Sequence, residues 1–233
     1  MSPNTHVLSG GAAAAVVKAV EAEFKKATGQ TIHGTFSAVG MMRDKLLAGE
    51  PCDVAILTRA LIDTLIASGH VVAGSARSLG RVKTGVAVRT GDAHPSVKTR
   101  AELHAALSAA QGIYFPDPEK ATAGIHVLNV LKALGLDQSL SSKFRVFPNG
   151  ATAMGEMAKS TESHLIGSTQ VTEINYTEGV DLVDVLPTEF ELITDYTLGV
   201  CTHAHNPAHA QLLAELLTGD ASAVVRKQGG FEF

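Results

Sequence analysis

The sequence contains few cysteines, little charge and no long apolar run. Its two cysteines, Cys52 and Cys201, are too few for a disulfide framework, and neither belongs to a CxxC motif. We therefore expect no redox or zinc chemistry and interpret both residues as buried apolar thiols. The longest apolar runs are well short of the roughly 20 residues that span a bilayer, so no membrane insertion is expected.

Positive charge is also scarce. Lysine and arginine number 19 against 23 aspartate and glutamate residues, which gives a formal net charge of -4. The sequence has no basic block and no basic stripe with interleaved aromatic residues, so a nucleic-acid partner is not expected. Apolar residues make up 45% of the 233 positions, which is enough to form a buried core.

The start of the chain lacks export features. Residues 1–6 lead directly into an apolar strand, without a basic start, an apolar stretch or a cleavage site. As written, the sequence predicts a cytoplasmic protein. If a leader has been removed from the native chain, a periplasmic location is predicted instead.

Short β-like runs alternate with amphipathic helices along almost the whole chain, which is typical of an α/β fold. Two such series are joined by a long β-rich stretch at residues 79–89, and β segments return near 180–185 and 194–201. The sequence therefore predicts two α/β lobes with a ligand cleft between them, joined by two crossover segments. We expect lobe 1 to comprise 1–82 plus 195–233, and lobe 2 to comprise 83–194.

Four predicted strand-to-helix turns consist of small residues and have no carboxylate in the first helical turn. Such turns let a ligand approach the backbone N–H groups of a helix N-terminus, which favours a carboxylate or an oxyanion. Alternatively, the glycines only close tight connections. The candidate ligand-binding residues in these turns are Ser9, Gly10, Gly11, Ala12, Ser37, Val39, Gly40, Thr122, Gly124, Asn149, Gly150 and Ala151.

Further polar candidates follow other predicted strands. Thr58 and Arg59 come after the third strand, and Arg89 comes after the central β-rich stretch, where its guanidinium is predicted to clamp a carboxylate. Thr169 and Gln170 follow the strand that ends near residue 167. The alternative interpretations are ion pairs for the two arginines and ordinary helix capping for Gln170.

The only metal-like spacing lies near the C-terminus. Cys201, His203 and His205 alternate, and His209 follows four residues later. Asn206 and Pro207 are typical of a helix start, which would leave the earlier histidines in a solvated connection without a nearby carboxylate. We expect no metal, and no cofactor either, because nucleotide-binding and serine-hydrolase motifs are absent from the sequence.

Several motifs resemble those of a known family. They are Phe-x-x-x-Thr-Gly at 24–29, Ala-Gly-x-Pro-x-Asp-Val at 48–54, Gly-Val-Ala-Val-Arg at 85–89 and Gly-Gly-Phe at 229–231. Over its whole length the chain resembles the molybdate-binding-protein-like branch of the type II periplasmic solute-binding fold, a branch that also includes aconitate isomerase. The resemblance implies two α/β lobes, with lobe 1 built from both chain ends.

The chain departs from the molybdate binders at the positions where they hold their oxyanion. Ala12 and Val39 replace hydroxyl-bearing residues, and Gln170 replaces a tyrosine. These differences favour a small organic carboxylate over molybdate. The resemblance therefore implies a substrate-binding protein for a small anionic solute, with a transporter permease as partner if the protein is exported.

An alternative implied by the same resemblance is a cytoplasmic isomerase or lyase that acts on an unsaturated polycarboxylate. Such a reaction moves a proton next to carboxylates, so it needs anion-binding groups and an acid or base. The candidate catalytic residues are His126, Glu156 and Glu173, each of which also has an ordinary structural interpretation. A cytoplasmic sensor of ligand occupancy is a third alternative that rests on the fold alone.

Overall fold

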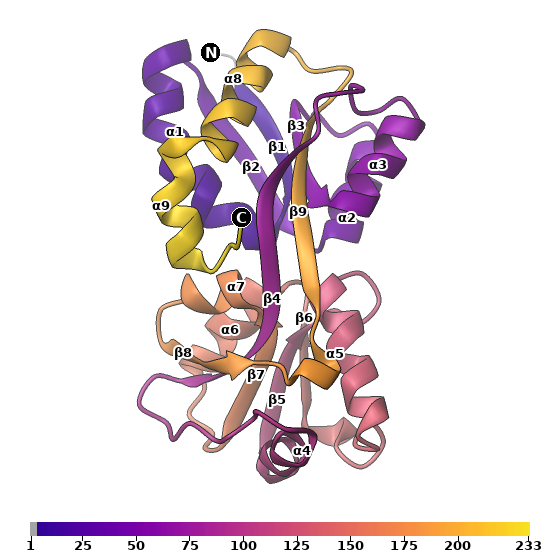
Figure 1. Ribbon diagram of the computed structural model, residues 1–233, viewed down its shortest axis with the longest axis vertical. Coiled ribbons are helices and arrows are strands. Elements are labelled where there is room, and N and C mark those ends of the chain that lie inside the picture. Colours follow the sequence, from indigo (N-terminus) through magenta and orange to yellow (C-terminus); the bar gives the residue numbers. More distant parts are fainter. Residues whose placement is uncertain (1–3) are drawn as a thin grey trace. The chain divides into compact units, whose positions relative to one another are not determined.

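The computed structural model describes residues 4–233 and has the predicted α/β architecture (Figure 1). The chain divides into two compact units. Unit 1 consists of Met1–Arg81 together with Thr194–Phe233, and unit 2 consists of Val82–Ile193. These boundaries lie one residue from those expected for the lobes, and unit 1 contains segments from both ends of the chain.

In unit 1, a mixed sheet has the strand order β2-β1-β3-β9. The strands β1 (Asn4–Gly10), β2 (Thr31–Ser37) and β3 (Val54–Thr58) are parallel, whereas β9 (Ile193–Val200) runs antiparallel to β3. The helical segments are η1 (Gly11–Ala13), α1 (Ala14–Thr28), α2 (Val39–Leu47), α3 (Arg59–Ala67), α8 (Pro207–Thr218) and α9 (Asp220–Gly229).

Local sequence signals set the bounds of α1 and α8 in unit 1. In α1 the apolar stripe of Val16, Val17, Val20 and Phe24 is buried, and the helix ends at Gly29, whose φ of 72° is the left-handed conformation that glycine favours. The predicted cap of α8 is confirmed, because the Asn206 side chain accepts a hydrogen bond from the backbone N–H of His209. α1, α8 and α9 pack against one another, while α2 and α3 pack on the strands.

In unit 2, β5 (Gly112–Pro116) lies between two parallel neighbours, β6 (Phe144–Phe147) and β7 (Leu165–Gln170). β4 (Arg77–Arg89), which begins in unit 1, pairs antiparallel with β7, and β8 (Val180–Val185) pairs antiparallel with β4. The helical segments are α4 (Arg100–Ala109), α5 (Thr122–Ala133), η2 (Ser141–Lys143), α6 (Gly150–Lys159), α7 (Val171–Asn175) and η3 (Thr188–Phe190).

The sheet of unit 2 is buried on both faces. Along β5, Ile113 and Phe115 belong to one apolar cluster with Leu131 of α5, whereas Tyr114 belongs to a second cluster with Met154 of α6. This alternation follows from the two-residue period of a β-strand. Within the described residues, no helix combines the length and the apolar character that a membrane span requires.

A buried arginine ties the C-terminal helix of unit 1 to the start of β4. The Arg226 guanidinium is only 4% exposed and donates to the carbonyl oxygens of Leu79, Thr218 and Gly219 at 2.9, 2.8 and 3.0 Å. It also donates to the Ser222 hydroxyl at 3.1 Å. One side chain therefore completes the hydrogen bonding of two carbonyl groups at the end of α8 and of one at the start of β4.

We predict that Arg226→Met destabilises the fold, because methionine cannot donate to these carbonyl groups. The free energy of unfolding should fall by about 3 kcal/mol in urea titrations followed by circular dichroism. The control is Lys227→Met at the exposed neighbouring position, which should change it by less than about 0.5 kcal/mol. Equal effects of the two substitutions would contradict a structural role of Arg226.

Candidate functional site

The strand ends of unit 1 converge on one edge of its sheet. Gly10 at the end of β1 is paired with Ser37 at the end of β2, and Thr58 at the end of β3 is paired with Tyr196 of β9. In open α/β sheets, ligands bind beyond the carboxyl ends of the parallel strands. The structure thus gathers at one edge the predicted residues Ser9, Gly10, Gly11, Ala12, Ser37, Val39, Gly40, Thr58 and Arg59.

Three helical segments begin at this edge without help from side chains. Among the described residues, no side chain caps η1, α2 or α3, and their first turns contain no acidic residue. By contrast, α4 begins with a capping box between Thr99 and Glu102, and α8 is capped by Asn206. Because the first N–H groups of a helix have no partner within the helix, this edge of unit 1 is suited to an anion.

The turn after β1 is closely packed. A Cβ atom added to Gly10 would lie 2.7 Å from Cγ1 of Val39 and 3.0 Å from Cε1 of Tyr196, so a larger residue would displace one of these side chains. The hydroxyl of Ser9 is buried and donates to the Gly10 carbonyl at 2.8 Å, so it is already used within the turn. Val39 and Ala12 are buried apolar residues. The edge therefore combines backbone donors with apolar side chains.

The strand ends of unit 2 also share an edge. Pro116 at the end of β5 is paired with Phe147 at the end of β6, and Gln170 at the end of β7 is paired with Thr84 of β4. Among the described residues, no side chain caps α5, the helix that follows β5. The predicted residues at this edge are Thr122, Gly124, Asn149, Gly150, Ala151, Thr169 and Gln170.

The turn before α5 requires a glycine for close packing. A Cβ atom added to Gly124 would lie 2.2 Å from the carbonyl oxygen of Pro116 and 2.3 Å from that of Asp117. Since both contacts are with backbone atoms, no rotamer change would relieve them. The N-terminus of α5 is thereby held directly against the end of β5.

The N-terminus of α6 already carries a carboxylate, that of Glu173. Thr169 donates its hydroxyl proton to Oε2 of Glu173 at 2.6 Å, and the backbone N–H groups of Gly150, Ala151 and Gln170 also donate to this carboxylate. A Cβ atom on Gly150 would lie 2.1 Å from Oε2. Gly150, Ala151 and Thr169 thus donate to an internal carboxyl group, and a ligand-binding role for these turn residues stays a prediction.

The remaining residue of that turn is also used internally. The Asn149 side chain accepts a hydrogen bond from the backbone N–H of Thr152 at 2.8 Å and so caps α6. Burial raises the pKa of Glu173 above its usual range, although the hydrogen bonds from Thr169 and from the backbone oppose this shift. The ionised form of Glu173 is thus less favourable in the native protein than in water.

Two buried hydroxyl groups lie near the end of β7, and that of Thr84 was not predicted from the sequence. Oγ1 of Thr84 and Oγ1 of Thr172 are buried and have no hydrogen-bond partner in the described structure. Buried polar atoms are normally paired, so each hydroxyl marks a position where a water molecule or a solute group would complete the bonding. Thr84 is found only from the pairing of β4 with β7, because its local sequence has no recognisable motif.

Arg89 does not lie with the other candidates, and its predicted role is corrected. β4 runs antiparallel to β7, so Thr84 lies at the carboxyl end of β7 whereas Arg89 lies near its amino end and is paired with Val180. The guanidinium donates to the carboxylate of Asp92 at 3.0 Å and to the carbonyl of Ser160. Its two partners are groups of the protein, in agreement with the alternative interpretation of an ion pair.

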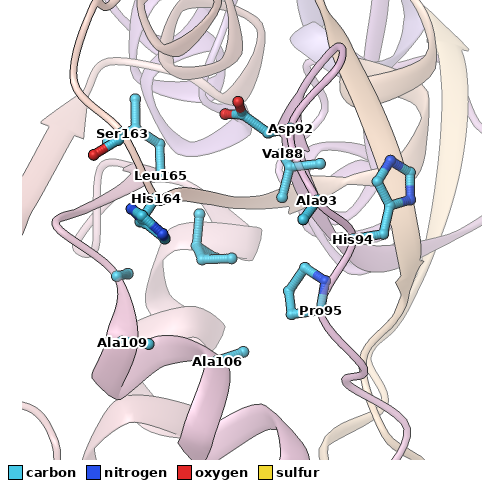
Figure 2. Close-up of a pocket in the computed structure, with 12 residues that line it drawn as sticks. Val88, Asp92, Ala93, His94, Pro95, Ala106, Ala109, Ser163, His164 and Leu165 are labelled. Atoms are coloured by element: carbon cyan, nitrogen blue, oxygen red, sulfur yellow. The ribbon is translucent and has the colours of Figure 1, made fainter.

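A cavity of about 300 Å³ lies in unit 2, beside the end of β4 and the start of β7 (Figure 2). Its walls include Val88 at the end of β4 and Leu165 at the start of β7, together with His94 and His164. His164 has a φ of 55°, in the left-handed region. None of the predicted site residues lines this cavity, so it is separate from the strand-end turns of unit 2.

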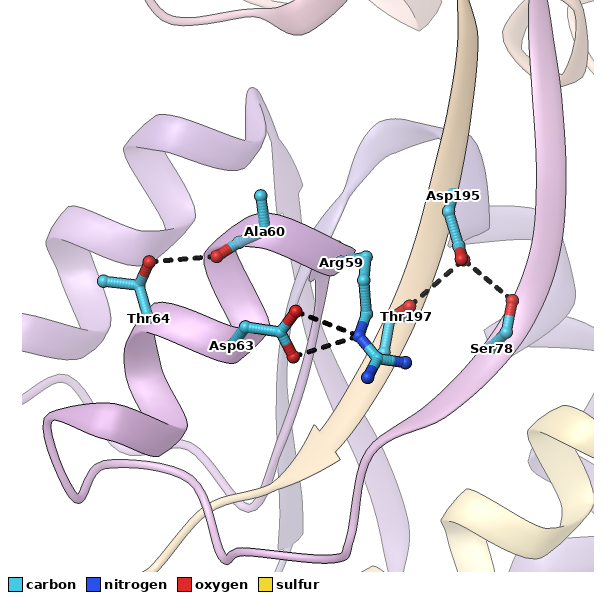
Figure 3. A network of polar contacts seen from close by, with 7 residues as sticks. All are labelled: Arg59, Ala60, Asp63, Thr64, Ser78, Asp195 and Thr197. Carbon is cyan, nitrogen blue, oxygen red and sulfur yellow. Dashed lines mark hydrogen bonds and ion pairs between the residues drawn. The ribbon is translucent and has the colours of Figure 1, made fainter.

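Arg59 is the first residue of α3 and lies at the strand-end edge of unit 1. Its Nε donates to both carboxylate oxygens of Asp63, at 2.9 and 3.1 Å, and both side chains are 53% exposed (Figure 3). The same figure shows Asp195 accepting hydrogen bonds from the hydroxyls of Ser78 and Thr197. The guanidinium of Arg59 is thus held by a surface ion pair at this edge.

Two of the three candidate bases have structural partners away from the strand ends. Nε2 of His126 lies 2.7 Å from the carbonyl oxygen of Phe190, and exposed Glu156 forms an ion pair with Lys159 at 2.8 Å. Only Glu173 lies at the strand-end edge of unit 2. Within residues 4–233, no group of three or more histidine, cysteine or acidic side chains is arranged to hold a metal ion.

Comparison with known proteins supports this description. A model of the family of bacterial extracellular solute-binding proteins matches residues 5–232. An aconitate isomerase from Pseudomonas sp is 27% identical over 232 residues, which cover 96% of this chain and 86% of that protein.

Two solved structures show the same fold. The periplasmic molybdate-binding protein of Azotobacter vinelandii matches with a TM-score of 0.80 and 16% identity, over 99% of each chain. The sulfate-binding protein SubI of Mycobacterium tuberculosis H37Rv matches with a TM-score of 0.75 and 14% identity, over 99% of this chain and 86% of the other. The fold is therefore the type II periplasmic binding fold, molybdate-binding-like, as the sequence motifs imply.

The raised pKa of Glu173 predicts a pH dependence of stability. In the unfolded chain this group titrates near the ordinary value of about 4.3. As the pH rises from there towards the raised native value, the unfolded state loses the proton first. The contribution of Glu173 to the free energy of unfolding should therefore be complete at pH values below the unfolded-state pKa and should decrease between that pKa and the native pKa. Urea titrations at a series of pH values measure this fall.

The Glu173→Gln variant keeps a neutral side chain, so its free energy of unfolding should fall less than that of the wild type over the same pH interval. Glu156→Gln removes a carboxyl group from an exposed position of α6, the helix whose N-terminus contacts Glu173, and should retain the wild-type pH dependence. Parallel curves for Glu173→Gln and the wild type would show that Glu173 does not titrate as described.

Proposed function

This chain belongs to the family of bacterial extracellular solute-binding proteins, and we propose that it captures a small anionic solute, of the organic carboxylate class, at its strand-end turns. The observation that carries the proposal is the set of helix starts at the edge of unit 1, where η1, α2 and α3 lack side-chain caps among the described residues. N–H groups that no side chain satisfies are well suited to receive the oxygen atoms of a carboxylate.

The side chains around these N–H groups support a solute with a carbon skeleton. Val39 and the Tyr196 ring both pack against Gly10, and Ala12 provides a methyl group where a hydroxyl would favour an inorganic oxyanion. Ligand sites for organic molecules commonly combine apolar walls with a few well-placed polar groups. Backbone donors would then hold the charged oxygens while the apolar side chains contact carbon.

Unit 2 supports fewer contacts with negative charge. Glu173 takes up the N–H groups at the start of α6, which leaves the start of α5 and the hydroxyls of Thr84 and Thr172 as the groups available at this edge. We therefore assign the charged end of the solute to unit 1.

A transporter permease is the proposed protein partner. Membership of an extracellular solute-binding family supports this assignment, since such receptors deliver their solute to a membrane transporter. Delivery requires the protein to lie outside the cytoplasm. The permease is therefore proposed together with the periplasmic location that is expected if a leader has been removed.

The second candidate function is isomerisation of an unsaturated polycarboxylate. The observation in its favour is the 27% identity to an aconitate isomerase. Glu173 is the proposed acid or base, because His126 and Glu156 have partners elsewhere and Glu173 lies at the strand-end edge. Its raised pKa makes the protonated form more favourable than in an exposed glutamate, as a proton donor requires.

A thermal-shift screen should separate these functions. A solute that binds only the folded state raises the melting temperature, and a concentration 100 times the Kd stabilises by about 2.7 kcal/mol. We expect stabilisation by di- or tricarboxylates, including both aconitate isomers, and little by molybdate or sulfate. Proton NMR of each stabilising compound then reports turnover: an unchanged spectrum supports binding alone, and isomer interconversion supports the enzyme. Stabilisation by molybdate alone would contradict the organic carboxylate.

The role of the uncapped helix starts is tested by Ala38→Asp. Ala38 is the N-cap residue of α2, so an aspartate there can accept hydrogen bonds from the N–H groups that the solute would use. We expect the affinity for the stabilising carboxylate to fall at least about tenfold, equivalent to 1.4 kcal/mol, in isothermal titration calorimetry. Ala48→Asp introduces the same charge at the exposed C-cap of α2 and should leave the affinity nearly unchanged. Equal losses in both variants would reject the helix start as the binding element.

A further inference from the structure

The two cysteines of the chain lie in contact inside unit 1. Cys52 immediately precedes Asp53 and β3, Cys201 immediately follows β9, and 149 positions separate them in sequence. The Cys201 thiol donates to the sulfur of Cys52, with 3.4 Å between the two Sγ atoms. Both residues are buried. The sequence predicts the burial correctly but does not indicate the contact.

Their contact is held by the neighbouring backbone. The N–H group of Cys201 donates to the Asp53 carbonyl at 2.9 Å. The buried Asp53 carboxylate accepts hydrogen bonds from the backbone N–H groups of His6 and His205, each at 2.6 Å. The carboxylate therefore binds both chain segments of unit 1, so the two sulfur atoms are brought together by a network that does not depend on them.

A pocket gives access to both sulfur-bearing residues. It has a volume of about 260 Å³, and its walls include Cys52, Cys201, His70, His203 and His205. A small oxidant such as hydrogen peroxide is much smaller than this volume. The thiols are thus buried by side chains but border a space that a small molecule can enter.

We propose that Cys52 and Cys201 form an oxidation site, in which a small peroxide converts the thiol pair into an intramolecular disulfide. One thiolate attacks hydrogen peroxide, which forms a sulfenic acid and, after protonation, a water molecule. The second thiol attacks that sulfur and displaces a second water molecule as the disulfide bond forms. In total, the two thiols lose two electrons and two protons, and one peroxide is reduced to two water molecules.

The pair is protected from rapid oxidation. The contact with the Cys201 thiol and burial both raise the pKa of the Cys52 thiol. The thiolate is the reactive form, so a raised pKa lowers its population at neutral pH. The disulfide should therefore form faster at pH 9 than at pH 7.

The disulfide would join the two pieces of unit 1. Cys52 belongs to the segment Met1–Arg81 and Cys201 to the segment Thr194–Phe233, with all of unit 2 between them in the chain. A cross-link that closes so long a loop removes many conformations from the unfolded state. Oxidation should therefore stabilise unit 1 without any new contact in the native protein.

The test is to treat the folded protein with hydrogen peroxide and to measure intact mass, thiol content after denaturation and melting temperature. We expect the loss of two hydrogen atoms, no titratable thiol, and a melting temperature higher by about 5 °C or more, reversed by dithiothreitol. The double variant Cys52→Ala/Cys201→Ala, treated in the same way, controls for methionine oxidation and should show no such rise. Each single variant should retain one thiol and remain free of the intramolecular link.

Three results would overturn the proposal. One is retention of both thiols in the folded protein under conditions that oxidise the urea-unfolded protein. Another is a disulfide between two chains instead of within one. The third is an intramolecular disulfide that leaves the melting temperature equal to that of the reduced protein. None of these results depends on the solute, so the proposed function is tested independently.

Discussion

The need to satisfy the first backbone N–H groups of each helix governs much of this structure. The protein meets that need in two ways at some helices and leaves it unmet by side chains at others. Side chains cap α4 and α8, and the internal carboxylate of Glu173 serves the start of α6 together with the Asn149 cap. At η1, α2, α3 and α5, no side chain of the described residues takes this role. Within each unit, helices that follow parallel strands begin at one edge of the sheet, so the N–H groups without a side-chain cap are concentrated at that edge and create a field that favours an anion.

The two units differ in whether an internal side chain accepts hydrogen bonds from the N–H groups at the helix starts. In unit 2, the buried carboxyl group of Glu173 occupies the N-terminus of α6, where a ligand would otherwise accept the same hydrogen bonds. The burial that raises the pKa of Glu173 shows that this position is poorly hydrated. In unit 1 the corresponding edge contains the apolar side chains of Val39 and Ala12, without an internal carboxylate in the first turns of the described helices. This asymmetry gives a physical reason to propose that the charge of the solute binds at unit 1.

Local patterns predict the features that depend on local residues. The apolar stripe of α1 and the Asn206 cap are both found from a few neighbouring residues, and the small-residue turns at Gly10 and Gly124 are found in the same way. Features that depend on distant pairing are missed. The position of Arg89 follows from the antiparallel register of β4 with β7, and no local motif reveals the direction of a neighbouring strand. Likewise, the turn at Gly150 looks open until Glu173 is brought against it, and the contact of Cys52 with Cys201 joins residues 149 positions apart.

The candidate edge of unit 1 depends on both ends of the chain. Gly10 and Val39 belong to the N-terminal segment, whereas Tyr196, whose ring packs on Gly10, belongs to the segment that follows unit 2. The same two segments are joined by the carboxylate of Asp53 and by the guanidinium of Arg226. These links involve residues far apart in sequence, so they form only after a large loss of chain entropy. The candidate edge is therefore completed by tertiary assembly of unit 1, and interactions that hold the C-terminal segment of unit 1 in place act on this edge as well as on stability.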